Sequence, residues 1–179
     1  MGGGGAPYLQ GMPQERAEEI EEMLIATLPG MKKRERDKAP YDLIYMPNNE
    51  KIEFKYSGLR DVQYATGFSG QLSWGNIARR EFSWLLLCGD LLENGLLFWL
   101  LPECVARYVL TKSGGGQITF VPDNAVPRRR KAAMIDLYRI TLEELRARCE
   151  KGGLGAERRE PGKVEKTVRV LPKIGLLSL

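Results

Sequence analysis

The sequence predicts a three-layer α/β domain in which a mixed β-sheet is flanked by helices. Three observations lead to this prediction. Apolar residues near the N-terminus recur at three- and four-residue spacing, which is typical of an amphipathic helix. Two short apolar runs surround the turn signal Pro47-Asn48-Asn49, and two near-continuous apolar runs further on have the character of strands covered on both faces. Helices before and after such strands bury their apolar faces against the sheet.

The size and composition of the chain suit one globular domain. It has 179 residues, of which 43% are hydrophobic and 28% are charged. We expect a flexible, glycine-rich tail over residues 1–13 without the pattern of a secretion signal, a catalytic domain over 14–150, and a polar C-terminal extension over 151–179. No apolar run approaches the ~20 residues that cross a bilayer. Three cysteines without a CxxC pair indicate a reducing, cytoplasmic location.

The secondary-structure signals follow one another along the chain. The predicted elements are a helix over Gln14–Leu28, hairpin strands at about Asp42–Met46 and Lys51–Ser57, a long loop with at most one short strand over 58–76, two buried strands in EFSWLLLCGD and GLLFWLLP, a short helix over Pro102–Leu110, a strand in QITFVP, a strand or extended segment in MIDLYRI, a helix that opens at Thr141, and a strand in KTVRVLPKIGLL. Thr141 and Glu144 fit a capping box, in which each side chain binds the other residue's backbone N–H.

Histidine is absent from the whole chain, and this excludes several mechanisms. Ser-His-Asp and Cys-His hydrolysis and His-ligated zinc all need an imidazole. Catalysis would therefore depend on carboxylates, lysine and a hard metal ion. The net charge of +4 suits a polyanionic partner without requiring one.

Three polar residues in the predicted hairpin form a candidate site. Side chains alternate along a strand, so Glu53 and Lys55 share the face opposite Phe54. If the turn is Pro47 to Glu50, Asp42 lies opposite Lys55 and diagonal to Glu53, close enough for both carboxylates to reach one cation. A slip of one residue would destroy this arrangement. The alternative for the same residues is a solvated strand face with a weak cross-strand ion pair.

The chemistry that uses such a cluster is phosphodiester hydrolysis. Oxygen ligands suit Mg²⁺, and Mn²⁺ can substitute for it. The cation would polarise a phosphoryl oxygen and acidify a water, while a neighbouring lysine orients or deprotonates the attacking water.

Asp42 followed by the Glu53-Phe54-Lys55 triplet on a hairpin resembles the signature of the PD-(D/E)xK nucleases, which include type II restriction endonucleases and junction resolvases. Glu53-Phe54-Lys55 is the only E-x-K triplet in the chain. The resemblance implies a restriction-endonuclease-like core, metal ligation by Asp42, Glu53 and the Phe54 carbonyl, and a catalytic Lys55. The family's proline directly precedes its aspartate, whereas Pro40 here lies two residues before Asp42. The family also uses a glutamate from its first helix, which implies a catalytic role for Glu21 beside the apolar face of that helix.

Nucleic-acid contacts are expected from two polar segments. The Gly/Ser-rich loop offers Gln71, Ser73, Trp74 and Asn76, and the basic run offers Arg128, Arg129, Arg130 and Lys131, which can neutralise phosphates. The alternative for the basic run is an ordinary solvated loop.

The predicted function is a Mg²⁺-dependent endonuclease that cuts DNA in the manner of a small restriction enzyme and acts as a homodimer, since a symmetric pair of sites cuts both strands. Two alternatives stay open. One is a structure-selective nuclease such as a Holliday-junction resolvase, and the other is a non-catalytic nucleic-acid-binding module on the same fold.

Overall fold

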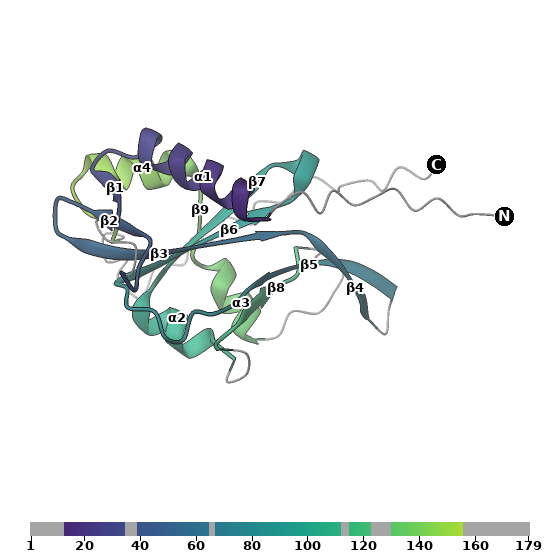
Figure 1. The fold of residues 1–179 in the computed structure, drawn as a ribbon. Helices are drawn as coiled ribbons and strands as arrows, with labels where there is room; N and C mark the ends of the chain where they lie inside the picture. Colours follow the sequence, from purple (N-terminus) through teal and green to yellow (C-terminus); the bar gives the residue numbers. More distant parts are fainter. Residues whose placement is uncertain (1–12, 35–38, 65–66, 112–114, 123–129, 156–179) are drawn as a thin grey trace, which may run out of the picture.

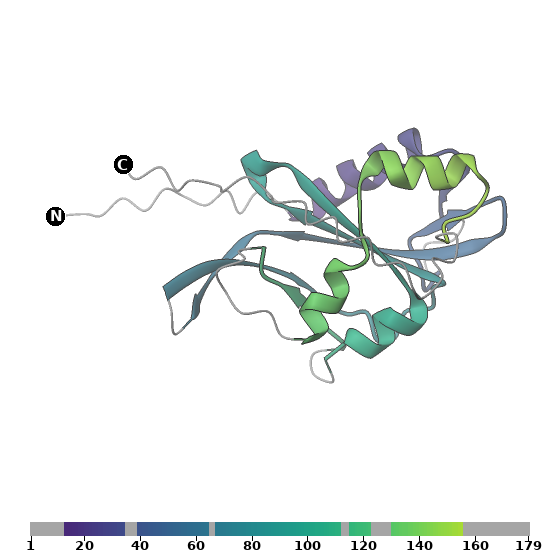
Figure 2. The same ribbon diagram turned by 180° about the vertical axis from the view of Figure 1, so that it is seen from behind.

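The chain folds into three layers around a central sheet (Figures 1 and 2). The computed structural model describes residues 13–34, 39–64, 67–111, 115–122 and 130–155. Helices α1 (Pro13–Thr27) and α4 (Leu142–Glu150) cover one face of the large sheet. The other face is covered by α2 (Glu103–Val109), α3 (Arg130–Asp136) and a second, smaller sheet. The predicted three-layer α/β fold is confirmed.

The large sheet is mixed and has the strand order β1-β2-β3-β6-β7-β9. Its strands are β1 (Met31–Lys33), β2 (Leu43–Tyr45), β3 (Glu50–Gly58), β6 (Trp84–Asp90), β7 (Leu96–Pro102) and β9 (Arg139–Ile140). The central pair β3 and β6 runs parallel, and the other pairs of this sheet are antiparallel. The two apolar runs predicted as strands are β6 and β7, joined by a short turn of 3-10 helix at Leu92–Asn94.

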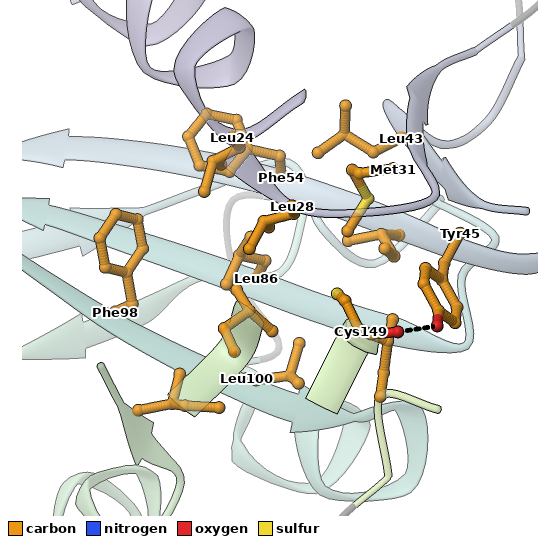
Figure 3. Packing of buried hydrophobic residues seen from close by; sticks show 14 of the residues in the cluster. Leu24, Leu28, Met31, Leu43, Tyr45, Phe54, Leu86, Phe98, Leu100 and Cys149 are labelled. Carbon is orange, nitrogen blue, oxygen red and sulfur yellow. Dashed lines mark hydrogen bonds between the residues drawn. The ribbon is translucent and has the colours of Figure 1, made fainter. Parts of the chain in front are cut away.

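The core under α1 and α4 forms because apolar side chains of helices and strands meet at the spacing that each element requires. Leu24 of α1 and Leu28, which directly follows α1, pack with Phe54 of β3 and Leu86 of β6 in one buried cluster (Figure 3). The Tyr45 hydroxyl donates to the carbonyl of Cys149 at 2.8 Å (Figure 3) and so ties β2 to the end of α4. The helix predicted over Gln14–Leu28 is confirmed within one residue at each end.

The hairpin register differs by two residues from the prediction. Tyr45 pairs with Glu50, so the four turn residues are 46–49 rather than 47–50. Asn49 adopts a positive φ of 56°, a conformation that asparagine tolerates better than most residues. Asp42 therefore lies across from Glu53 instead of Lys55, and its backbone N–H donates to the Ile52 carbonyl at 3.1 Å. A shift of two keeps every side chain on its predicted face.

Two strands of the second sheet lie within residues 58–76, and the prediction of a long loop with at most one short strand there is wrong. The second sheet has the order β4-β5-β8, with β4 (Arg60–Tyr64), β5 (Gly67–Trp74) and β8 (Ile118–Phe120). Glycine and serine obscure the strand pattern in the sequence, but Leu72 and Trp74 alternate with polar residues and are buried against β6 and β7. This close packing uses Gly89 of β6, because a Cβ there would lie 2.4 Å from Leu72 Cδ1.

The described part of the C-terminal half agrees with the prediction except in one segment. The short helix α2 and the strand β8 are confirmed, and Thr141 and Glu144 form both hydrogen bonds of the capping box. The segment MIDLYRI was expected to be extended, but its first residues end α3 and the β9 strand comprises Arg139–Ile140 alone. Tertiary packing explains the difference, since Ile135 is buried in the core beneath α2.

Three predicted segments lie outside the described residues, namely most of the N-terminal tail, the strand in KTVRVLPKIGLL and most of the C-terminal extension. Among the helices that the structure describes, none combines the length and apolar character of a transmembrane span.

Candidate active site

The structure brings Asp42, Glu53 and Lys55 together on one face of the large sheet. Glu53 and Lys55 are two residues apart on β3, and the Lys55 ammonium lies 2.7 Å from Glu53 Oε1. Asp42 directly precedes β2, the strand paired with β3. Its Oδ2 accepts a hydrogen bond from the Phe54 backbone N–H at 3.1 Å, which orients the carboxylate at the strand edge. The two carboxylates and the ammonium thus lie close together on this face, and their roles in metal binding and catalysis stay predictions.

Arg80 joins this cluster, and the sequence did not reveal it. Its Nε donates to Glu53 Oε1 at 2.8 Å, and its Nη2 donates to Asp42 Oδ1 at 3.0 Å. The guanidinium therefore bridges the two carboxylates. Arg34 adds a further ion pair, with its Nη1 3.4 Å from Asp42 Oδ1. Arg80 is 27 residues from Glu53 along the chain, and no spacing rule relates a loop arginine to a hairpin at that distance.

Glu53 is fully buried, with 0% of its surface exposed, and this determines the electrostatics of the site. Burial raises the pKa of its carboxyl group, while the hydrogen bond from Lys55 opposes the shift. Its second oxygen, Oε2, is buried and has no hydrogen-bond partner among the described residues. An unpartnered carboxylate oxygen in the interior is costly, so this atom would gain from a cation ligand.

The donor set fits a hard divalent cation that keeps part of its own water shell. Asp42 and Glu53 supply carboxylate oxygens, the ligand type that Mg²⁺ prefers, and one or two protein carboxylates are enough for ions that also bind substrate phosphate. Within the described residues, no three acidic or cysteine side chains lie close enough together to hold a metal ion. The candidate site therefore offers two carboxylates, and metal ligation by Asp42, Glu53 and the Phe54 carbonyl stays a prediction.

Glu21 lies near the cluster but has a different partner. Its Oε1 is 3.3 Å from Lys33 Nζ on β1. Burial raises the pKa of Glu21, Lys33 opposes that shift, and the negative charge of Asp42 adds to it. The Glu21 side chain is thus within electrostatic range of Asp42, and its catalytic role stays a prediction.

The loop that carries Arg80, residues 75–83 between β5 and β6, is held by Arg107 of α2. The Arg107 guanidinium donates to the carbonyls of Ala78 at 2.9 Å and Arg80 at 2.5 Å, and more weakly to that of Ile77 at 3.3 Å. It also lies 4.6 Å from the centre of the Phe82 ring. These contacts fix the loop backbone from beneath, so the position of Arg80 depends on a residue in a different element.

A cavity of about 320 Å³ borders the same loop. Lys51, on the same face of β3 as Glu53, lines it together with Glu81 and Phe82 of the loop and with Glu103 and Arg107 of α2. The polar face of β3 thus continues from the carboxylates into a hollow with charges of both signs.

Trp74 does not have the exposed position that a nucleic-acid contact requires. It is 1% exposed, its indole N–H donates to the Cys88 carbonyl at 2.9 Å, and its ring packs edge-on against Trp99. The prediction for Trp74 is therefore corrected, because the alternation along β5 points its side chain into the core.

The polar neighbours of Trp74 have more accessible positions. Gln71 and Ser73 are half-buried, and Asn76 is exposed at the start of the loop that carries Arg80. The Ser73 backbone N–H donates to the Ser57 hydroxyl at 2.9 Å, and its own hydroxyl accepts from Gln117. Because Ser57 follows Glu53 and Lys55 on the same face of β3, Ser73 lies on the side of the sheet that carries the site. Contact of these three residues with nucleic acid stays a prediction.

The basic run is described only in part. Arg128 and Arg129 lie outside the described residues, and Arg130 begins α3. Lys131 is exposed, lies 5.6 Å from the centre of the Tyr108 ring, and donates to the Leu110 carbonyl at 3.3 Å. Phosphate binding by this run stays a prediction.

Comparison with known proteins finds similarity among solved structures but not among sequences. No protein-family model matches the chain, and no curated protein matches it either. Among solved structures, the chain is similar to a bacterial homing endonuclease, I-Ssp6803I, with 19% sequence identity and a TM-score of 0.47 over 78% of this chain and 91% of that one.

Proposed function

We propose that the chain is a divalent-metal-dependent endonuclease that hydrolyses DNA phosphodiester bonds. One observation supports this function above the others. Asp42, Glu53 and Lys55 lie together on one face of the large sheet, and Glu53 keeps a buried oxygen without a hydrogen-bond partner in the described part of the chain. Carboxylates with a lysine beside them are suited to cleavage of a phosphodiester by water without histidine.

In this proposal each side chain has a distinct task. Asp42 and Glu53 hold Mg²⁺ or Mn²⁺, and the ion, when bound, supplies charge that polarises the phosphoryl oxygen and acidifies water. Lys55 is kept in place by Glu53 Oε1, so its ammonium is directed at the same spot as the carboxylates. There it orients the attacking water and offsets the negative charge that builds up on the phosphate as one P–O bond forms and another breaks.

Two classes of DNA substrate are compatible with this activity, and each is expected to be bound in a different way. A restriction-type enzyme that cuts both strands would act as a homodimer, with one site for each strand. A structure-selective nuclease would instead prefer branched DNA and contact mainly backbone and shape. Sedimentation of the purified protein with and without a DNA duplex tests the dimer.

A plasmid assay tests the activity. Wild-type protein is incubated with supercoiled plasmid, linear duplex or a four-way junction, in Mg²⁺, Mn²⁺ or EDTA, beside Glu53→Gln and Lys55→Ala. We expect metal-dependent cutting by the wild type and a loss of at least about 100-fold in each variant, since a positioned acid–base or electrostatic group contributes that much or more. Glu150→Gln is the matched control, because Glu150 is an exposed carboxylate on α4 paired with Arg146.

The charge balance of the site favours one competing function. Arg80, Lys55 and Arg34 already neutralise the two carboxylates, which is what a non-catalytic nucleic-acid-binding module on this fold would need. That module predicts salt-sensitive DNA binding in EDTA and intact plasmid under every metal condition. Intact plasmid, together with equal DNA binding by wild type and Glu53→Gln, would support the non-catalytic module and refute the nuclease.

A further inference from the structure

Arg80 binds one oxygen of each of the two carboxylates that are proposed to hold a shared cation. Its Nε and Nη2 donate to Glu53 Oε1 and Asp42 Oδ1, at 2.8 and 3.0 Å. Both bonds are charge-assisted, and the planar guanidinium carries them side by side. A divalent ion that bound both carboxylates would therefore have to compete with Arg80.

The charges around the site make this competition strong. Three cationic groups, Arg80, Lys55 and Arg34, surround two carboxylates, so the cluster carries 3 − 2 = +1. Adding a divalent ion with all three cations in place would raise this to +3 beside a fully buried glutamate. Like charges a few ångströms apart in a partly buried site repel strongly, so metal binding favours the departure of one cation.

Arg80 is the cation whose departure would free both carboxylates, because it alone of these three contacts both Asp42 and Glu53. Lys55 belongs to β3 in the middle of the sheet, whereas Arg80 extends from a loop and 27% of its side chain is exposed. Arg107 holds the backbone carbonyls of that loop, including that of Arg80 itself. The Arg80 side chain can thus rotate away from the carboxylates while its backbone stays in place, which requires a change of rotamer and no opening of the loop.

From this geometry we infer that Arg80 is a displaceable internal counter-ion of the site. It holds Asp42 and Glu53 together without metal, competes with the divalent ion for them, and on release presents its guanidinium at the exposed edge, where a phosphate oxygen is its natural partner. Arg80 is thus a positioning residue that weakens metal binding in the absence of DNA. This inference rests on the proposed function, since it requires that the carboxylates bind a divalent ion.

Calorimetric titration with Mn²⁺ in the absence of DNA tests the competition. The proteins are wild type, Arg80→Ala, Arg80→Lys and, as a matched control, Arg79→Ala, which removes the exposed arginine next in the chain. We expect Arg80→Ala to bind Mn²⁺ at least about tenfold more tightly than wild type, because a bridging cation has been removed. The affinity of Arg80→Lys for Mn²⁺ should lie between those of wild type and Arg80→Ala, since lysine cannot bridge both carboxylates as a planar fork. The affinity of Arg79→Ala should match that of wild type.

A second measurement follows the wild-type protein and stays valid if Arg80→Ala fails to fold. In nitrogen-15 NMR spectra the Arg80 Nε–H signal, assigned by its loss in Arg80→Lys, should be protected from solvent exchange without metal. On addition of Mg²⁺ this protection should be lost as the hydrogen bond to Glu53 breaks. A signal that stays protected while Mg²⁺ binds would overturn the inference.

The outcomes separate the inference from the proposed function. If wild type binds Mn²⁺ and Arg80→Ala binds it equally or more weakly, Arg80 is a structural support and the counter-ion role is refuted, while the metal site stands. If neither protein binds Mn²⁺, the metal-dependent nuclease is refuted and the inference with it. Tighter binding by Arg80→Ala supports both.

Discussion

Replacing Arg107 by alanine should destabilise the protein through the loop that carries Arg80. The substitution removes hydrogen bonds to the carbonyls of Ile77, Ala78 and Arg80. A hydrogen bond from a charged donor contributes about 1.5–3 kcal/mol when buried, but Arg107 is 33% exposed, so water replaces part of each. We expect a loss of about 2 kcal/mol from the three bonds together, and about 0.5 kcal/mol more from the contact with the Phe82 ring.

Urea unfolding followed by circular dichroism measures this loss. For a chain of this size about 2.5 kcal/mol corresponds to a fall in Tm of roughly 5–10 °C. Hydrogen exchange should show faster exchange in residues 75–83 than in the wild type. The matched control is Arg146→Ala, because Arg146 forms an exposed ion pair with Glu150 at 3.0 Å and its loss should cost less than about 0.5 kcal/mol. If Arg107→Ala is no less stable than Arg146→Ala, Arg107 does not hold the loop.

Three further predictions follow from single contacts and single pKa values. Gly89→Ala should cost about 1–3 kcal/mol in urea unfolding, because its Cβ would meet Leu72, whereas Gly75→Ala, whose Cβ meets nothing within 4 Å, should stay within about 0.5 kcal/mol of wild type. A chromogenic thiol reagent should modify Cys104 alone in the native protein and three cysteines after denaturation, since burial raises the pKa of the other two thiols to about 12 and about 11. Burial, with the neighbouring charge of Asp90, raises the pKa of Tyr56 from 10.0 to about 12. The protonated Tyr56 hydroxyl thus contributes fully to the stability of the folded protein below pH 10, and this contribution is lost as the pH rises towards 12. The free energy of unfolding should therefore fall less steeply over that range in Tyr56→Phe than in wild type.

Local rules were sufficient to predict the hairpin and its polar face. Alternation along a strand depends only on neighbouring residues, so Glu53 and Lys55 had to share a face once β3 formed. The hairpin register was two residues from the prediction, yet Asp42 still joined them because a shift of two preserves the face. The capping box at Thr141 and the apolar strands β6 and β7 are likewise encoded within a few residues of sequence.

What only the tertiary structure decided are the contacts between segments far apart in the chain. Arg80 reaches Asp42 and Glu53 because β6 lies parallel to β3, and this brings the loop before β6 to the end of β3 where the hairpin carboxylates lie. The burial of Trp74 depends on the second sheet, which packs on β6 where Gly89 leaves room. No pattern in a local window records such pairings, since they result from which apolar faces cover one another. The sequence by itself therefore determined which charged side chains lie on the polar face of the hairpin, and the pairing of β6 with β3 determined which arginine reaches its carboxylates.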